Sequence, residues 1–179
     1  MKVQLDQFNN SWYNPGSKIV IVIWLLFSFM FLRTAFPWPL LLKRFILRLF
    51  GAKIGREVML KPNINIKYPW KLSIGNHVWI GENVWIDNLA NVTIRNNVCI
   101  SQGAFLLTGN HNYKKPTFDL EIGEINLADG VWIGAKSVVC PGISCAENSV
   151  LSVVSVATKN LESNTIYQGN PAVAKRKRV

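Results

Sequence analysis

The sequence predicts an all-β solenoid, a parallel β-helix built from six-residue repeats. An aliphatic residue returns at every sixth position over three long stretches, and glycine often follows it. The repeated residues are Ile74, Ile80 and Ile86, then Ile94, Ile100 and Leu106, then Leu127, Ile133, Val139, Cys145 and Leu151. This period matches neither the 3.6 residues of an α-helical turn nor the two-residue alternation of a strand, and it is typical of hexapeptide β-helices.

Each hexapeptide is expected to supply one short strand and one corner, so three hexapeptides make one triangular coil. The whole repeat region then holds about five to six coils. The positions four residues after the repeated aliphatic residue are small or β-branched, as a tight inner corner requires: Val78, Val84, Val98, Val131, Ser137 and Ser149. Triplets such as Val-Trp-Ile, punctuated by Asn and Gly, favour strands and turns over a helix.

Three regions are expected along the chain. Residues 1–50 form an apolar, basic and helical appendage, residues 51–162 form the repeat domain, and residues 163–179 form a basic terminal segment. The apolar run Ile19–Leu32 is 14 residues long, whereas a bilayer-spanning helix needs roughly 18 or more. The polar stretch before it and the lack of a small-residue cleavage site after it do not fit a signal peptide.

A second helix is predicted before Gly51, which is expected to end it. Its apolar residues share one face: Leu42, Phe45, Ile46, Leu49 and Phe50. Lys43, Arg44 and Arg48 occupy the other faces. Such a helix can cap the open end of a β-helix, where backbone groups and core are otherwise bare. It can also lie on an anionic membrane surface, and the two roles are compatible.

Composition narrows the choice of partners. The chain has 179 residues, a formal net charge of +10 and an apolar share of 49%, so it can build one core and favours anionic ligands or surfaces. Nucleic acid is disfavoured, because the charge is spread over the appendage, the tail and a loop without a recognition motif. Cys99, Cys140 and Cys145 have no pairing pattern, so reduced thiols and a cytoplasmic location are expected.

The repeat is interrupted at three places. It slips by two residues at 67–71 and again between Ile86 and Ile94, and it breaks fully at Thr108–Asn126. A polar insertion of this length in a compact solenoid is uncommon unless it is functional. The large interruption contains His111, directly after a predicted strand, and an imidazole can act as a base near neutral pH. The other histidine, His77, is expected to be a solvent-facing corner residue.

Other catalytic devices are not evident in the sequence. Two distant histidines and unpaired cysteines do not form a zinc site, so no metal is expected. There is no nucleophile elbow, phosphate-binding loop or dinucleotide fingerprint. What remains is a direct transfer reaction assisted by a single general base.

Four motifs carry a family resemblance: TGNHNY at 108–113, GVWIGAKSVVCPGI at 130–143, NSVLSVVSVATKN at 148–160, and YQGNPA at 167–172. Together they resemble the hexapeptide-repeat acyltransferases, most closely the colanic-acid-biosynthesis acetyltransferases of the maltose/galactoside O-acetyltransferase class. The resemblance covers about residues 51–176. It implies a left-handed parallel β-helix, a homotrimer, an active site between two subunits, and acetyl-CoA in the groove between them.

The resemblance also implies roles for individual residues. His111 corresponds to the general base that removes a proton from an acceptor hydroxyl. Asp87 and Asn88 resemble acceptor-binding or histidine-orienting positions, although both residue types also stabilise turns. Asn110 is expected to orient His111 or to hold the loop.

The positions that correspond to the coenzyme-binding residues are Trp132, Ala135, Val153, Thr158, Lys159 and Arg176. The resemblance implies that Ala135 and Val153 contact pantetheine through their backbones and that the last three face adenine and phosphates. Relatives often have Gly or Ala where this chain has Val153 and Val154. Trp132 either lines the acyl pocket or stacks outside the coil.

The predicted function is CoA-dependent O-acetyl transfer to a sugar hydroxyl in surface polysaccharide synthesis. The predicted location is cytoplasmic, with peripheral contact at the inner face of the membrane. The alternative hypothesis is a non-catalytic β-helix scaffold or a module that binds anionic membrane surfaces. A carbonic-anhydrase-like β-helix is disfavoured by the shortage of histidine.

Overall fold

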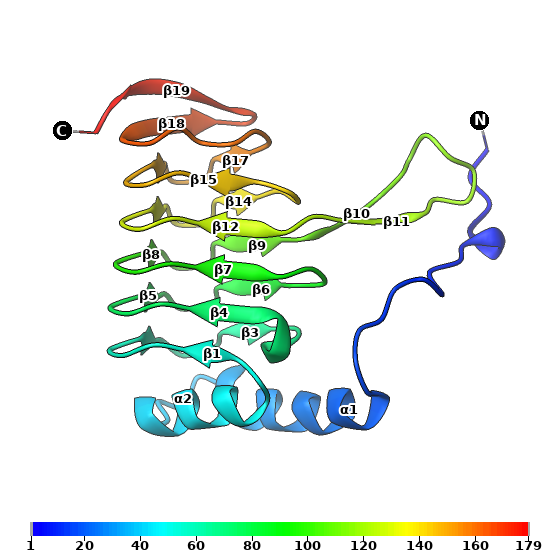
Figure 1. Ribbon diagram of the computed structural model, residues 1–179, viewed down its shortest axis with the longest axis horizontal. Helices are drawn as coiled ribbons and strands as arrows, with labels where there is room; N and C mark the ends of the chain where they lie inside the picture. Colours follow the sequence, from blue (N-terminus) through cyan, green and yellow to red (C-terminus); the bar gives the residue numbers. More distant parts are fainter. Residues whose placement is uncertain (1, 179) are drawn as a thin grey trace.

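The computed structural model describes residues 2–178 and consists of a stack of β coils standing on a helical base (Figure 1). A short 3₁₀ helix, η1 (Leu5–Gln7), lies near the N-terminus. The base contains α1 (Lys18–Phe27), its π-helical continuation η2 (Ser28–Leu32), and α2 (Leu40–Leu49). The predicted class, an all-β solenoid with a helical N-terminal appendage, is confirmed.

Three parallel sheets form the walls of the stack. Wall 1 contains β1 (Lys53–Ile54), β4 (Leu72–Ile74), β7 (Val92–Ile94), β12 (Ile125–Leu127) and β15 (Ser144–Cys145). Wall 2 contains β2 (Met59–Leu60), β5 (Trp79–Ile80), β8 (Cys99–Ile100), β13 (Trp132–Ile133), β16 (Val150–Leu151) and β18 (Thr165–Gly169). Wall 3 contains β3 (Asn65–Ile66), β6 (Trp85–Asp87), β9 (Phe105–Leu107), β14 (Val138–Val139) and β17 (Val156–Ala157).

The chain visits walls 1, 2 and 3 in turn, so that three strands complete one of about six coils. The last strand, β19 (Ala172–Lys177), turns back and pairs antiparallel with β18. This reversal ends the parallel stack, because β19 covers the edge that a further coil would otherwise extend.

The six-residue repeat forms the core. On wall 2, Ile80 pairs with Ile100, Ile100 with Ile133, and Ile133 with Leu151. All four side chains are at most 1% exposed. The small corner positions predicted to point inward are equally buried. Gly134 is required by close stacking, since a Cβ there would lie 2.6 Å from the backbone nitrogen of Val153 in the next coil.

The helical base caps the first coil through one side-chain donor for each wall. Elsewhere, each coil donates backbone N–H groups to the carbonyls of the next coil, as Gly55 does to Ile74. The first coil has no coil before it, so its own carbonyls need other donors. Arg48 Nη2 donates to Ile54 O at 2.8 Å, Lys43 Nζ to Leu60 O at 3.3 Å, and Trp24 Nε1 to Ile66 O at 3.0 Å. The predicted capping role is confirmed.

The apolar face predicted for α2 is buried only in part. Lys43, Ile46 and Leu47 face the stack, whereas Phe45 and Leu49 are 61% and 64% exposed. Lys43 faces the stack because the open end of the solenoid presents unpaired carbonyls. Its ammonium group donates to two of them, Leu60 O and Lys61 O. The predicted end of the helix is confirmed, since Gly51 has a φ of +89°.

Replacing Lys43 with methionine is expected to lower the free energy of unfolding by about 1–2 kcal/mol, because two carbonyls lose their donor. Burial lowers the pKa of Lys43 below the ordinary 10.5. Between the lowered value and 10.5 the unfolded chain binds more protons than the folded one, so wild-type stability gains relative to the variant as pH rises. Denaturant unfolding at several pH values measures both effects.

Arg44→Met is the matched control, because Arg44 is the adjacent base and its Nε donates only to Leu40 O within the same helix. It should change stability by less than about 0.5 kcal/mol, as surface substitutions usually do. Equal losses in the two variants, or a difference from wild type that does not grow with pH, would contradict the proposed capping role of Lys43.

No helix among residues 2–178 is long and apolar enough to cross a membrane. The three cysteines are free, and Cys145 is buried whereas Cys99 and Cys140 are half-buried. Burial raises the pKa of the Cys145 thiol to about 12. His77 is an exposed corner residue, as expected, and its Nδ1 lies 2.9 Å from a carboxylate oxygen of Glu57.

Candidate active site

All three interruptions of the repeat fall on one edge of the stack, between wall 3 and wall 1. The first contains the 3₁₀ helix η3 (Pro69–Lys71), the second follows Asp87, and the third is a hairpin between β9 and β12. The hairpin strands are β10 (Gly109–His111) and β11 (Leu120–Ile122), which pair antiparallel and project from the stack (Figure 1). The sequence located these interruptions correctly, and the fold stacks them one above another.

His111 is held inside the hairpin by Phe118. The imidazole Nδ1 lies 2.9 Å from Phe118 O, and the two rings stack with centroids 4.4 Å apart and planes 6° from parallel. A carbonyl oxygen can only accept, so this contact assigns the proton to Nδ1 and leaves a lone pair on Nε2. In the neutral form of the ring, Nε2 is therefore the nitrogen available as a base.

Asn110 fixes the backbone of the hairpin. Its side chain is exposed, and its Oδ1 accepts a hydrogen bond from the backbone N–H of His111 at 2.8 Å. This contact holds the loop at His111. It does not involve the imidazole ring.

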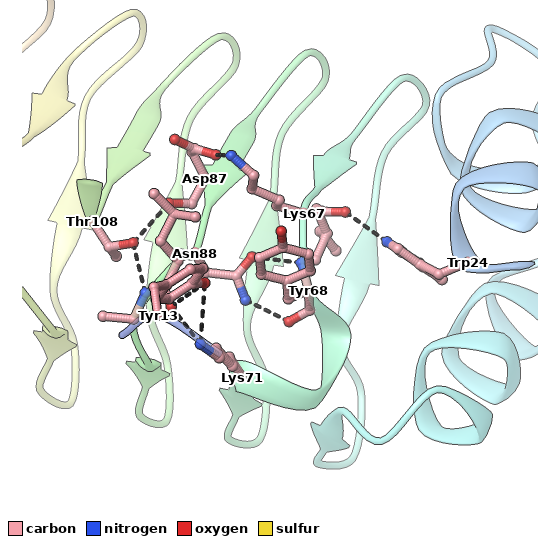
Figure 2. A network of polar contacts seen from close by, with 11 residues as sticks. Tyr13, Trp24, Lys67, Tyr68, Lys71, Asp87, Asn88 and Thr108 are labelled. Atoms are coloured by element: carbon pink, nitrogen blue, oxygen red, sulfur yellow. Dashed lines mark hydrogen bonds and ion pairs between the residues drawn. The ribbon is translucent and has the colours of Figure 1, made fainter. Parts of the chain in front are cut away.

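Asp87 lies directly beside the base of the hairpin. Its carboxylate forms an ion pair with Lys67, with Oδ1 and Nζ 2.9 Å apart, and its carbonyl accepts from Thr108 Oγ1 at 2.8 Å. Thr108 Oγ1 in turn accepts from the N–H of Ala90 at 3.0 Å. Thr108 therefore joins the strand that leads into the hairpin to the interruption one coil earlier (Figure 2).

Asn88 is fully buried, and both ends of its amide are bonded to one residue. Oδ1 accepts from the N–H of Tyr68 at 3.0 Å, and Nδ2 donates to Tyr68 O at 2.6 Å (Figure 2). These bonds connect the first interruption, which contains Tyr68, to the second, which contains Asn88. They favour the turn-stabilising role for Asn88 over contact with an acceptor.

The N-terminal segment crosses this edge as a strap, defined here as residues 2–16. Its backbone bonds to the hairpin from Gln4 N to Pro116 O at 2.8 Å, and the Phe8 ring lies 5.6 Å from that of His111. Tyr13 Oη donates to Leu89 O at 2.8 Å. Burial, with smaller contributions from nearby Tyr68 and Asp87, raises the pKa of Tyr13, so its hydroxyl remains a donor.

Lys71 joins the strap to the same edge. Its Nζ donates to Leu89 O at 2.7 Å and to Tyr13 Oη at 3.1 Å, and it lies 4.5 Å from the centre of the Tyr13 ring (Figure 2). Sequence reasoning missed Phe8, Tyr13, Lys71 and Phe118. Phe8 and Tyr13 are isolated aromatic residues in the polar N-terminal stretch, and Lys71 and Phe118 lie inside the interruptions, but neither signal identifies their partners.

The predicted coenzyme-binding residues lie at two corners and on the terminal strand. Ala135 and Val153 occupy neighbouring coils at the corner between walls 2 and 3, where Val154 N donates to Ala135 O at 2.9 Å. Thr158 and Lys159 follow β17 on the edge that carries the hairpin. Arg176 lies on β19, beside Ile166. Wall 3 separates the two corners, so a ligand that reaches both must run along it.

Trp132 lies outside the coil. It is 46% exposed on wall 2, and its Nε1 donates to Ser101 Oγ at 2.9 Å. Of the two roles expected for this residue, the position fits stacking on the outer surface. Among residues 2–178, no group of three or more His, Cys, Asp or Glu side chains could hold a metal ion.

The corner at Val153 and Val154 is strained. Val154 has a φ of +55°, a left-handed conformation that is unfavourable for a β-branched residue, and asparagine occupies such corners at Asn83, Asn97 and Asn148. Replacing Val154 with asparagine is expected to raise the free energy of unfolding by about 1 kcal/mol. Thermal unfolding should show a melting temperature about 3 °C higher.

Val153→Asn is the matched control for this effect. Val153 is exposed to a similar extent, 59% against 65% for Val154, but it has no positive φ. Its replacement relieves no strain and should not raise the melting temperature. A rise of equal size in both variants would show that surface polarity, and not backbone strain, is responsible.

The chain is similar to known proteins along most of its length. It is 35% identical to the protein of Escherichia coli (strain K12) named "Putative colanic acid biosynthesis acetyltransferase WcaF", over 93% of this chain and 92% of the relative. It is 28% identical to the galactoside O-acetyltransferase of the same strain, over 67% of this chain and 61% of that protein. No protein-family model matches the chain.

Solved structures share the fold. A galactoside acetyltransferase in complex with coenzyme A superposes with a TM-score of 0.78 at 22% identity, covering 90% of this chain and 82% of that one. A hexapeptide-repeat acetyltransferase from Vibrio cholerae, complexed with acetyl-CoA, superposes with a TM-score of 0.75 at 22% identity and covers 81% of each chain.

Proposed function

This chain belongs to the hexapeptide-repeat acetyltransferase family that includes WcaF and is an acyltransferase, and we propose that it transfers an acetyl group from acetyl-CoA to a sugar hydroxyl. The observation that carries the proposal is the setting of His111. Its Nδ1 is bonded to Phe118 O, its ring stacks on Phe118 and lies 5.6 Å from the Phe8 ring, and this leaves Nε2 as the candidate base. The name of the relative WcaF, a colanic acid biosynthesis acetyltransferase, supports polysaccharide synthesis as the setting.

The proposed reaction is a direct transfer within a ternary complex. A sugar hydroxyl is a weak nucleophile near neutral pH, and His111 Nε2 removes its proton as the oxygen attacks the thioester carbon. The C–O bond forms, the C–S bond breaks, and the imidazolium returns the proton to the departing thiolate. Backbone N–H groups at a coil corner would stabilise the oxyanion. No covalent enzyme intermediate is needed, because both substrates are bound together.

The coenzyme-binding part of the proposal rests on charge and position. Lys159 and Arg176 are exposed cations near the end of the stack that β19 covers. Cationic groups suit the phosphates of CoA. Thr158 lies next to Lys159 and would face the adenine end. Ala135 and Val153 would contact pantetheine through their backbones. Asp87 and Asn110, at the base and on the strand of the hairpin, remain the candidates on the acceptor side.

We also propose that the active form is a homotrimer. The outward side chains of wall 1 are polar, whereas those of walls 2 and 3 are largely apolar: Met59, Trp79, Cys99, Trp132 and Ile166 on wall 2, and Trp85, Phe105, Val138 and Val156 on wall 3. Trp79 is 63% exposed in the single chain. Apolar surface of this extent favours burial between subunits.

The decisive experiment measures acetyl transfer by the purified full-length chain. Acetyl-CoA is mixed with a panel of sugar nucleotides and glycans, free thiol is recorded with time, and acetylated products are identified by mass spectrometry. Thiol release that depends on one class of sugar supports the proposal. Absence of acceptor-dependent release across the panel, together with no CoA binding by calorimetry, would overturn it. Sedimentation velocity tests the trimer separately.

A further inference from the structure

The underside of the helical base is a large exposed apolar surface. We define the basal face by nine apolar residues that are 51–76% exposed: Ile19, Val22, Leu25, Leu26, Phe29, Met30, Leu41, Phe45 and Leu49. Ile19 and Phe29 are above 70% exposed. Monomeric soluble proteins rarely expose so many large apolar side chains on neighbouring helices, and contiguous patches of this kind usually mark interaction sites.

The basal face points away from the stack. On α1 and η2 the inward stripe is Trp24, Ser28 and Leu32, and on α2 it is Lys43, Ile46 and Leu47. The exposed residues lie on the opposite sides of the same helices. Both helices lie across the end of the stack, and no other described segment covers their outer sides (Figure 1). Every residue of the face is therefore accessible on the side of the helices that faces away from the coils.

The charge around this face has a single sign. Between Gln7 and Arg56 the sequence contains no Asp or Glu, but it contains seven Lys or Arg residues: Lys18, Arg33, Lys43, Arg44, Arg48, Lys53 and Arg56. Only Lys43 of these is buried. Lys18 begins α1 and Arg33 follows η2, so exposed cations stand at both ends of the longest apolar stripe.

The exposed apolar face and the cations around it together favour a partner that is both apolar and anionic. We propose that the basal face binds the surface of an anionic phospholipid bilayer, with the two helices lying in the interface. The apolar side chains would enter the acyl boundary while the flanking cations contact lipid phosphates. Helices of ten residues are too short to cross the bilayer. A second copy fits poorly, because docking two basal faces would bring together two sets of cations without a single acid.

The consequence for the proposed function is geometric. The coils stack away from the basal face, so the hairpin with His111 would stand above the lipid surface on one side of the molecule (Figure 1). In a trimer with parallel stacks, three basal faces would share one plane and bind with avidity. The membrane proposal itself does not depend on acetyl transfer, and vesicle binding tests it independently.

The test is flotation of the full-length chain with vesicles of phosphatidylcholine alone and with about one third phosphatidylglycerol. The wild type should float with the anionic vesicles and should bind the neutral ones at least about fivefold more weakly. Leu26→Gln/Leu49→Gln should weaken binding to anionic vesicles by about tenfold or more. Lys18→Gln/Arg33→Gln should weaken binding to anionic vesicles by about tenfold and leave neutral vesicles unaffected.

The matched control is Leu5→Gln/Val173→Gln, which changes two apolar residues that are 65% and 51% exposed far from the base. It should float like the wild type. Leu41→Gln changes a single residue, at the most exposed position of the face. It should weaken binding less than the double variant does, and it tests the face without requiring that the fold tolerate two substitutions. Equal binding by wild type, basal variants and control, or no flotation at all, would overturn the proposal. So would a fall in molecular mass of the basal variants in sedimentation, because that result assigns the face to contacts between copies.

Discussion

Replacing His111 with alanine is expected to lower kcat for acetyl transfer by about three orders of magnitude, the usual contribution of a well-placed general base. The imidazole Nε2 is the nitrogen of His111 that can take the hydroxyl proton, because Nδ1 is bonded to Phe118 O. The variant should still bind acetyl-CoA, because the candidate coenzyme contacts lie on wall 2, at the two corners beside wall 3 and on β19, outside the hairpin. Initial rates of thiol release and calorimetric CoA binding measure the two effects separately.

His77→Ala is the matched control, because it removes the other histidine. His77 lies at an exposed corner, paired with Glu57, and has no contact with the hairpin. Its removal should leave kcat within about twofold, as expected for a surface substitution. A His111→Ala variant that keeps a third or more of wild-type activity on an accepted sugar would rule out the general-base role. The acyltransferase assignment would survive that result, because it depends on the family.

The core was predictable because a six-residue period has few structural solutions. Ile80, Ile100, Ile133 and Leu151 were identified from spacing as repeat positions, and in the structure they pair in register on wall 2. The corner insertions were equally visible, because an interruption changes the spacing. Their stacking on one edge follows from three repeats per coil once the interruptions fall at the same phase.

The base shows where spacing is insufficient. Helical periodicity placed Phe45 and Leu49 on one apolar face with Ile46, but the structure buries Lys43 beside Ile46 and leaves Phe45 and Leu49 exposed. The reason lies outside the helix, in three carbonyls of the first coil that have no backbone donor. The amphipathic pattern shows which face of the helix is apolar. Capping depends instead on which side-chain donors can reach the backbone carbonyls of Ile54, Leu60 and Ile66. The apolar residues left outside then form the basal face.

The candidate site also contains residues that the sequence could locate and residues that it could not. His111 could be found because it sits where the repeat fails, so a local anomaly marked it. Phe118 could not be assigned from spacing, because its contact depends on how the hairpin folds back seven residues later. Phe8 is more remote still, since the strap reaches the hairpin only after the stack has formed. The coenzyme residues came from resemblance, and their division between two corners needed the order of the walls.

Replacing Asn88 with alanine is expected to lower the free energy of unfolding by about 2–4 kcal/mol, because the backbone N–H and carbonyl of Tyr68 both lose their partner. The melting temperature should fall by roughly 8 °C for a chain of this size. Acetyl transfer per folded molecule, measured well below the melting temperature, should remain within a few-fold of wild type. The expected change is therefore in stability, with KM for the acceptor almost unchanged.

Asn91→Ala tests whether any asparagine of this interruption would behave in the same way. Asn91 is exposed, and its Nδ2 donates to Glu124 Oε1 at 2.8 Å on the surface. Its loss should cost less than about 0.5 kcal/mol. If Asn88→Ala instead melts with the wild type and raises KM for the sugar, then Asn88 contacts the acceptor in the assembled enzyme. The two hydrogen bonds from Asn88 to the Tyr68 backbone would then be dispensable for stability, and the interruption at 87–91 would serve substrate binding.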